Sequence, residues 1–134
     1  MRARELELPA GAGAEYGVAN GLVGIGPGLG AKAERMIHRF ATLPEGAFVW
    51  TRDRAGGYHL GRVAGPMRED RSAPARAVGL VYVRRADWLG RTFGEDEVPG
   101  AVARTFARGG RNLQRTHDPA AERRTAELWR DTAE

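Results

Sequence analysis

The chain has 134 residues, of which 42% are hydrophobic and 28% are charged, a composition typical of one globular domain and too apolar for wholesale disorder. It contains no cysteine and only three scattered histidines, which excludes disulfides and argues against a zinc site. No apolar run approaches the roughly 18 residues of a membrane span, and the basic start MRAREL is not followed by the apolar core of a signal peptide, so we expect a cytoplasmic protein with no membrane partner.

Positive charge is concentrated in the middle of the chain. Residues 47–116 hold thirteen basic and seven acidic side chains, whereas residues 1–46 hold five of each and residues 117–134 hold three and five. All basic residues but Lys32 are arginine, and part of this preference reflects the codon bias of a GC-rich genome. Arginine presents a planar fork to phosphate and stacks on flat rings. A basic middle with interleaved aromatics therefore favours a nucleic-acid partner over a merely solvated charged face.

The first half of the chain predicts one strand, one helix and one hairpin. Residues 1–15 are expected to form a short strand or a frayed end, and residues 16–26 a kinked, glycine-containing strand. Residues 27–43 are periodic in the manner of a helix that ends before Pro44. The segments GAFVWTRD and YHLGRVAG alternate around the turn RAGG, the strongest hairpin signal in the chain. The apolar face of the helix consists of Leu29, Ala33, Met36, Ile37 and Phe40.

The second half predicts a polar loop at 66–76, a long strand at 77–89, a short helix at 95–110, a last strand at 111–116 and a closing helix at 118–134. Asp118 is expected to be the N-cap of the closing helix, with Pro119 at its first position. These elements predict an α+β fold, in which a small, partly closed, mixed β-barrel of about five to six strands is capped by two or three helices. The whole of 1–134 is expected to be a single domain, with its core between the sheet and the helices.

A glycine-rich turn precedes the first predicted helix. In GIGPGLGA the residues Gly26, Gly28 and Ala31 match a dinucleotide-binding spacing. A hairpin rather than a βαβ unit follows, and Pro27 interrupts the loop, so we do not expect a dinucleotide cofactor. A glycine-rich turn at a helix start still leaves backbone N–H groups free for an anion or the edge of a base.

Catalytic residues are not evident. A PD-(D/E)xK nuclease needs a lysine shortly after a strand acid, and Lys32 lies in the first predicted helix. The acids Asp53, Glu69 and Asp70 are expected to be ion-pair partners or loop charges rather than magnesium ligands. We therefore expect a protein that is not an enzyme and has no cofactor or metal.

Four aromatic residues fall in the predicted sheet: Trp50, Tyr58, Tyr82 and Trp88. Any one of them is more often core than ligand platform, because aromatics fill small barrels. In FVWTR, however, Trp50 shares a strand face with Arg52, which predicts a partly exposed indole beside a charge. Such a pair is typical of a surface on which nucleic-acid bases stack.

Three segments, GAFVWTRDRAGGYHLGRVAGPM, VGLVYVRRADWL and VPGAVARTFARGGRNLQRT, carry a family resemblance. Their order resembles the PUA-like superfamily, most closely the EVE-like and YTH-like branch of prokaryotic modification-dependent restriction proteins, over roughly residues 16–116. The resemblance implies a barrel that holds one flipped, often modified base beside the first strand and first helix. It implies a base pocket formed by Asn20, Gly24, Ile25, Gly26, Trp50 and Trp88. It implies contacts with the nucleic-acid backbone from Arg52, Arg84, Arg85, Arg108 and Arg111.

Family members that cage a methylated base usually place one aromatic after the first strand and another after the return strand. Here these segments read GPGLG and MREDRSAPARA. The pocket would then take a different base, rely on Trp50 or Trp88, or no longer bind a base. The family's usual nuclease or GTPase domain has no counterpart in this sequence, so that cleavage would need a separate nuclease subunit.

The sequence thus favours a module that recognises a modified base in DNA in a defence setting. Alternatives are an RNA-binding PUA-like domain and a protein-interaction domain that docks a partner through Leu128 and Trp129 of the closing helix. A small enzyme acting on nucleotides is the least favoured hypothesis.

Overall fold

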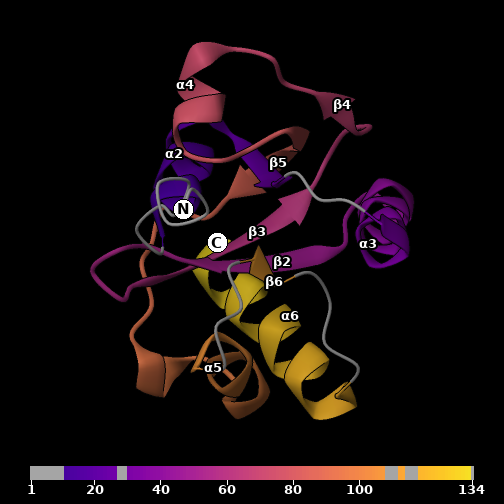
Figure 1. Cartoon of the computed structure of the whole chain (residues 1–134). Helices are drawn as coiled ribbons and strands as arrows, with labels where there is room; N and C mark the ends of the chain where they lie inside the picture. The colour runs from indigo at the N-terminus through magenta and orange to yellow at the C-terminus, as the bar shows by residue number, and fades with distance from the viewer. Residues whose placement is uncertain (1–10, 27–29, 108–111, 114–117, 134) are drawn as a thin grey trace.

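The structure is a computed structural model of the whole chain, and it describes residues 11–26, 30–107, 112–113 and 118–133. Its centre is a curled, half-barrel sheet with the strand order β1-β5-β3-β2-β6, and β4 pairs with β5 off this path (Figure 1). The strands are β1 (Leu22–Ile25), β2 (Phe48–Arg52), β3 (Tyr58–Val63), β4 (Arg68–Glu69), β5 (Tyr82–Trp88) and β6 (Asn112–Leu113). The helices are α2 (Ala12–Asn20), α3 (Gly30–Thr42), α4 (Ala73–Ala77), α5 (Gly100–Ala107) and α6 (Pro119–Ala133), with a 3-10 turn at Glu95–Glu97. The fold belongs to the α+β class, as the sequence predicts.

Helices cover both faces of the sheet. Residues opposite one another in paired strands point to the same side, so the pairing shows which side chains share each face. The face that α3 covers, called here the α3 face, carries a core of Val23, Ile25, Val49, Val63 and Ala86 around Phe40 of α3. On the opposite face, α5 and α6 pack over Trp50, Tyr58 and Leu60. Further along that face, α2 and α4 lie over Leu22 and Val83. Figure 1 shows α3 on its own at one side of the sheet, away from α5 and α6.

The hairpin and the first and last helices of the sequence analysis are confirmed. β2 and β3 pair in the register Trp50↔Leu60, around a turn in which Gly56 adopts φ 92°, a left-handed conformation that favours glycine. α3 ends at Thr42, before Pro44. At the start of α6, the carboxylate of Asp118 accepts hydrogen bonds from the backbone N–H groups of Ala120 and Ala121, as an N-cap does.

Four predictions about the elements are wrong. Residues 16–26 do not form one strand: α2 runs from Ala12 to Asn20, and only Leu22–Ile25 is extended. The predicted polar loop contains β4 and the short helix α4, which Ser72 caps by accepting a hydrogen bond from the N–H of Ala75 at 3.3 Å. The described residues contain five α-helices rather than two or three, and every strand pair among them is antiparallel rather than mixed.

The remaining elements are shorter than predicted. β5 begins at Tyr82 rather than at residue 77, and the helix expected at 95–110 is the 3-10 turn followed by α5. Of the strand expected at 111–116, residues 112–113 pair with β2, and the others lie outside the described residues. Within the part of the chain that the structure describes, no helix has both the length and the apolar character to cross a membrane.

Candidate nucleic-acid interface

The apolar face of α3 is only partly covered. Phe40, near the C-terminal end of the helix, is 1% exposed, whereas Ala33 and Ile37 are half-buried and Met36 is 38% exposed. Since these residues share one face at helical spacing, burial decreases along that face from the C-terminal end towards the start of the helix. The first half of α3 therefore leaves apolar surface beside the sheet in contact with solvent.

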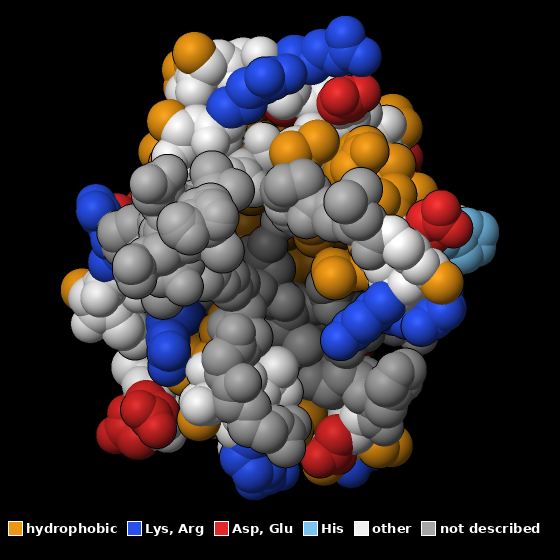
Figure 2. Space-filling model, in the orientation of Figure 1, with side chains coloured by type: hydrophobic (Ala, Val, Ile, Leu, Met, Phe, Trp, Pro, Cys, Tyr) orange, Lys and Arg blue, Asp and Glu red, His pale blue; other side chains and the backbone are white. Residues whose placement is uncertain are grey.

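Tyr82 and Met67 lie at the edge of the same core. Tyr82 is the first residue of β5, and it lies opposite Ile25 of β1 and opposite Glu69 of β4. Its ring and the side chain of Met67 are half-buried and, like Ile37, pack against the core of the α3 face. We call Ile37, Met67 and Tyr82, with Met36 next to them on the helix, the apolar rim. Figure 2 shows hydrophobic side chains gathered between α3 and β4.

Cations border the apolar rim on the side of α3. Lys32, Arg35 and Arg39 follow one another at spacings of three and four along one flank of α3, next to Met36, and all three are exposed. Arg68 of β4 is also exposed, but it lies opposite Val83 and so belongs to the face away from Tyr82, whereas Glu69 lies opposite Tyr82. The charge of Arg68 helps to hold the pKa of Asp70 below its ordinary value, after the stronger effect of the hydrogen bonds from Ser72. Among the described residues none of the three α3 cations has a carboxylate within ion-pair distance. In Figure 2, Lys and Arg side chains lie on both sides of the hydrophobic group.

Of the predicted base-pocket residues, only Ile25 and Gly26 lie at the end of β1 where the apolar rim begins. Ile25 is buried beside Tyr82, and Gly26 is exposed, with room for no side chain because a Cβ there would lie 2.9 Å from the carbonyl oxygen of Gly79. Gly24 is opposite Val83, whose side chain belongs to the other face of the sheet. Asn20 is at the exposed end of α2, and its side-chain amide donates to the carbonyl of Tyr16. Gly24 and Asn20 therefore lie apart from the apolar rim.

The two tryptophans predicted for the pocket do not contribute to it. Trp50 is 1% exposed, packs edge-on against Phe93 and donates from its indole nitrogen to Thr125 of α6. The prediction of exposure was wrong because both faces of β2 are covered, Val49 on the α3 face and Trp50 on the other. Trp88 is half-buried over Gly61 and donates to the carbonyl of Leu22. It lies six residues beyond Tyr82 along β5, about 20 Å at the usual rise of a strand.

The arginines predicted to contact phosphates are also distributed differently. The guanidinium of Arg52 lies over the rings of Tyr58 and Phe106, at 5.8 and 5.7 Å from their centroids, on the face opposite α3. Arg84 is only 3% exposed and is bonded to backbone carbonyls, so it is not a surface cation. Arg85 is exposed, but it lies opposite Leu22 on the face away from Tyr82. Arg108 and Arg111 lie outside the described residues.

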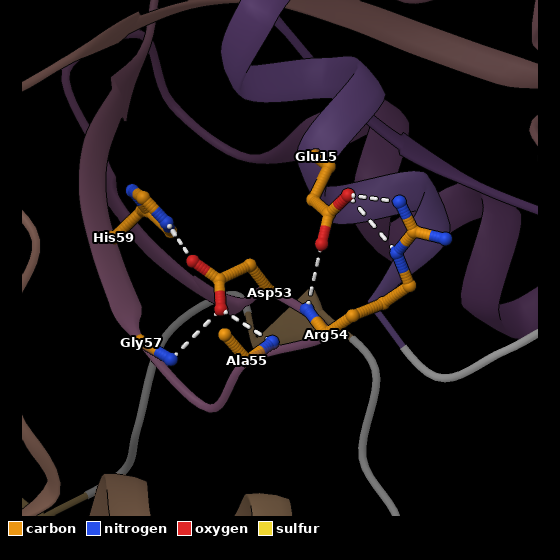
Figure 3. A network of polar contacts seen from close by, with 6 residues as sticks. All are labelled: Glu15, Asp53, Arg54, Ala55, Gly57 and His59. Carbon is orange, nitrogen blue, oxygen red and sulfur yellow. Dashed lines mark hydrogen bonds and ion pairs between the residues drawn. The ribbon is translucent and has the colours of Figure 1, made fainter.

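A second polar cluster holds the turn of the β2–β3 hairpin (Figure 3). The Asp53 carboxylate accepts hydrogen bonds from the N–H groups of Ala55 and Gly57, at 3.0 and 2.8 Å, and lies 2.8 Å from Nε2 of His59. Burial favours a higher pKa for Asp53, but the bonds from His59 and Gly57 outweigh it and lower the pKa. Asp53 is thus a hydrogen-bond partner of His59, and the contact is an ion pair, as expected from the sequence, when the imidazole is protonated.

Glu15 of α2 fastens the same turn from outside. Its carboxylate accepts hydrogen bonds from the backbone N–H of Arg54 and from the guanidinium of that residue, the latter at 2.8 and 3.0 Å (Figure 3). These bonds lower the pKa of Glu15. The cluster thus joins α2 to the hairpin, and its groups are engaged with one another rather than directed at a ligand.

The described residues include no group of three or more histidine, aspartate or glutamate side chains arranged to hold a metal ion.

Sequence reasoning missed Tyr82 and Met67 as site residues. The alternation Tyr82, Val83, Arg84 in β5 did contain a signal for Tyr82, since it places the ring on the α3 face, but Met67 is in a loop without periodicity.

Comparison with protein-family models, curated proteins and solved structures gave no match to this chain. The function is therefore inferred from the arrangement of its side chains.

Proposed function

We propose that this protein is a nucleic-acid-binding module that holds one base against the apolar rim while the cations on the flank of α3 hold the neighbouring phosphates. The observation that carries the proposal is the half-exposed ring of Tyr82 on the face of the sheet that α3 covers, together with the exposed cations Lys32, Arg35 and Arg39 along the flank of that helix. Aromatic rings stack on bases of any sequence, and arginine pairs with phosphate, so the two chemistries fit one ligand.

The place of the rim agrees with a PUA-like fold, which we propose on the resemblance of the sequence. In that family the base lies beside the first strand and first helix, and the rim lies at the end of β1 beside α3. A base in a duplex reaches such a position only when it is flipped out of its stack. We favour DNA with a modified base as the ligand, in a defence setting where a separate nuclease subunit would cut, and RNA as the alternative.

Docking of a protein partner through the closing helix is not supported. Leu128 is 6% exposed within the core that α5 and α6 form, and Trp129 is half-buried against Phe48, with ring centroids 5.9 Å apart. Leu128 therefore belongs to the core, and Trp129 uses part of its ring to pack against the sheet.

Fluorescence-anisotropy titration at two salt concentrations tests the proposal. The ligands are matched oligonucleotides of DNA and RNA, single- and double-stranded, unmodified or carrying cytosine or adenine modifications. We expect one modified ligand to bind tightest and the affinity to fall steeply with salt. Replacing Tyr82 by Ser should weaken that complex about 5- to 150-fold, corresponding to roughly 1–3 kcal/mol of stacking, whereas Tyr82→Phe should retain the binding.

Two results would contradict the proposal. One is the absence of binding to any oligonucleotide at low salt. The other is binding that Tyr82→Ser leaves unchanged, which would mean that the cations provide a nonspecific grip without base recognition.

A further inference from the structure

The apolar rim is carried by three elements, α3, the β3–β4 connection and β5. The buried side chain of Arg84 links these three elements. From β5, Nε of Arg84 donates to the carbonyl of Gly65 at 2.6 Å. One terminal nitrogen donates to the carbonyls of Phe40 and Leu43, at 2.9 and 2.8 Å. Phe40 lies in the last turn of α3, Leu43 directly follows the helix, and Gly65 lies two residues before Met67. Tyr82 stands two residues before Arg84, on the same face of β5.

The surroundings of Arg84 are unusual for a guanidinium. It is 3% exposed, and no carboxylate within the described chain forms an ion pair with it. Burial lowers its pKa, and the charge of Glu45 acts in the opposite direction. A buried cation is costly unless its donors are bonded, and here Nε and one terminal nitrogen donate to three backbone carbonyls. Carbonyls at the end of a helix are good partners for a cation, because they carry the negative end of the helix dipole.

Among the residues that the structure describes, no comparable bond attaches the start of α3. In the first part of the helix the residues on its apolar face are half-buried or exposed, and Phe40, beside the Arg84 bond, is the one α3 residue buried in the core. The position of α3 relative to Tyr82 and Met67 therefore depends on contacts at one end of the helix, and the guanidinium supplies the polar part of them.

We infer that Arg84 is a positioning residue that sets the width of the apolar rim by tying the end of α3 and the β3–β4 connection to β5. The inference rests on the proposed function, in that the rim is the base-binding surface. It assigns to Arg84 a role different from a phosphate contact: the side chain never touches the ligand, and its loss acts through the placement of Ile37 and Met67.

Hydrogen exchange of the free protein tests the attachment without any ligand. Arg84→Met keeps the apolar stem and removes every donor, and it leaves buried carbonyls unsatisfied. We expect the amides in the second half of α3 to exchange at least about tenfold faster, while those of α6 keep their rates. Arg84→Lys, which retains a cation that can bond some of the carbonyls, should give an intermediate rate, and Arg85→Met, its exposed neighbour, should give no change.

Unchanged exchange in α3 of Arg84→Met would overturn the inference. An equal increase in α3 and α6 would also overturn it, since the residue would then serve the core as a whole. If Arg84→Met does not fold, the Arg84→Lys variant decides by the same comparison of α3 with α6.

Titration of the best oligonucleotide adds a second readout. A positioning residue lowers the affinity without changing the dependence of log Kd on log salt, whereas a lost phosphate contact reduces that slope by about 0.9 on duplex DNA. A reduced slope in Arg84→Lys or Arg84→Met would overturn the inference. Failure of the wild type to bind any oligonucleotide would refute the proposed function instead, and the exchange experiment would still establish whether Arg84 holds α3.

Discussion

The indole nitrogen of Trp50 donates a hydrogen bond to the hydroxyl of Thr125 at 3.2 Å, and each of these two residues is 1% exposed. The bond joins β2 to α6 across 75 positions of the chain. It satisfies a donor that would otherwise be buried unpaired, which costs more than a hydrogen bond gains. Trp50 is therefore a residue of the core that fixes α6 on the sheet, not a platform for a ligand.

Replacing Thr125 by Val should destabilise the protein although it preserves the shape of the side chain. The buried indole N–H then lacks an acceptor, and we expect the free energy of unfolding to fall by about 1–3 kcal/mol. Thr125→Ser keeps the hydroxyl and is the control, which should lose less. Urea denaturation followed by tryptophan fluorescence measures both. An unchanged stability of Thr125→Val would show that the hydrogen bond to Trp50 does not matter at this position, and a larger loss in Thr125→Ser would assign the greater role to the methyl group.

Leu128→Ala should destabilise the protein without affecting any surface function of α6. Leu128 is buried with Val102 and Phe106 of α5, so that the substitution leaves a cavity, with an expected loss of about 2–5 kcal/mol. Thermal or urea unfolding measures the loss, and Ala133, exposed at the end of α6, offers a neutral control as Ala133→Ser. Unchanged stability would mean that Leu128 does not support the core, and docking of a partner through α6 would again be a candidate function.

The hairpin, α3 and α6 could be predicted because their signals are local. The alternation around RAGG, the apolar spacing that includes Phe40, and the Asp118 cap each lie within a few residues of chain. α2 could not, because its sequence contains Gly17 and β-branched Val18, which disfavour a helix. Tertiary contact decides there: Gly17 is buried, and a Cβ on it would lie 2.5 Å from the carbonyl oxygen of Leu22, so the helix packs at a distance that only glycine allows.

The exposure of a strand residue depends on which elements cover each face, and alternation alone does not reveal this. Trp50 shares its face with Arg52, and the charge suggested a surface. The guanidinium instead lies over Tyr58 and Phe106 at the margin of the core. Arg84 was predicted to contact phosphate for the same reason. Its partners are the carbonyls of Leu43 and Phe40, 41 and 44 positions earlier, and the sequence does not show that they come together around it.

Neutralising the cations on the flank of α3 should weaken nucleic-acid binding at low salt and reduce its salt dependence. For the triple variant Lys32→Gln, Arg35→Gln and Arg39→Gln, the slope of log Kd against log salt should fall by about 0.9 for each side chain that contacts a phosphate of duplex DNA. Stability should change by less than about 0.5 kcal/mol, because all three are exposed. Arg123→Gln, an exposed change on α6, is the control for net charge. An equal effect of the control would place the contact elsewhere.

Replacing Asp53 by Asn should produce a loss of stability that depends on pH. The hydrogen bonds from His59 and the turn hold the pKa of Asp53 below its ordinary value in the folded protein, so the ionised carboxylate favours folding. That contribution is complete above the unfolded-state pKa, which is about 3.9, and is lost as the pH falls through the lower folded-state pKa. At pH 7 we expect Asp53→Asn to cost roughly 1 kcal/mol, a modest figure because both side chains of the pair keep some contact with water.

Urea unfolding between pH 7 and pH 3 should show the difference in unfolding free energy from the wild type shrinking below about pH 4. The other carboxylates titrate in both proteins, so the difference isolates Asp53, and Asp96→Asn, an exposed change, should differ little from the wild type throughout. A difference that stays constant down to pH 3 would mean that the charge of Asp53 does not stabilise the turn.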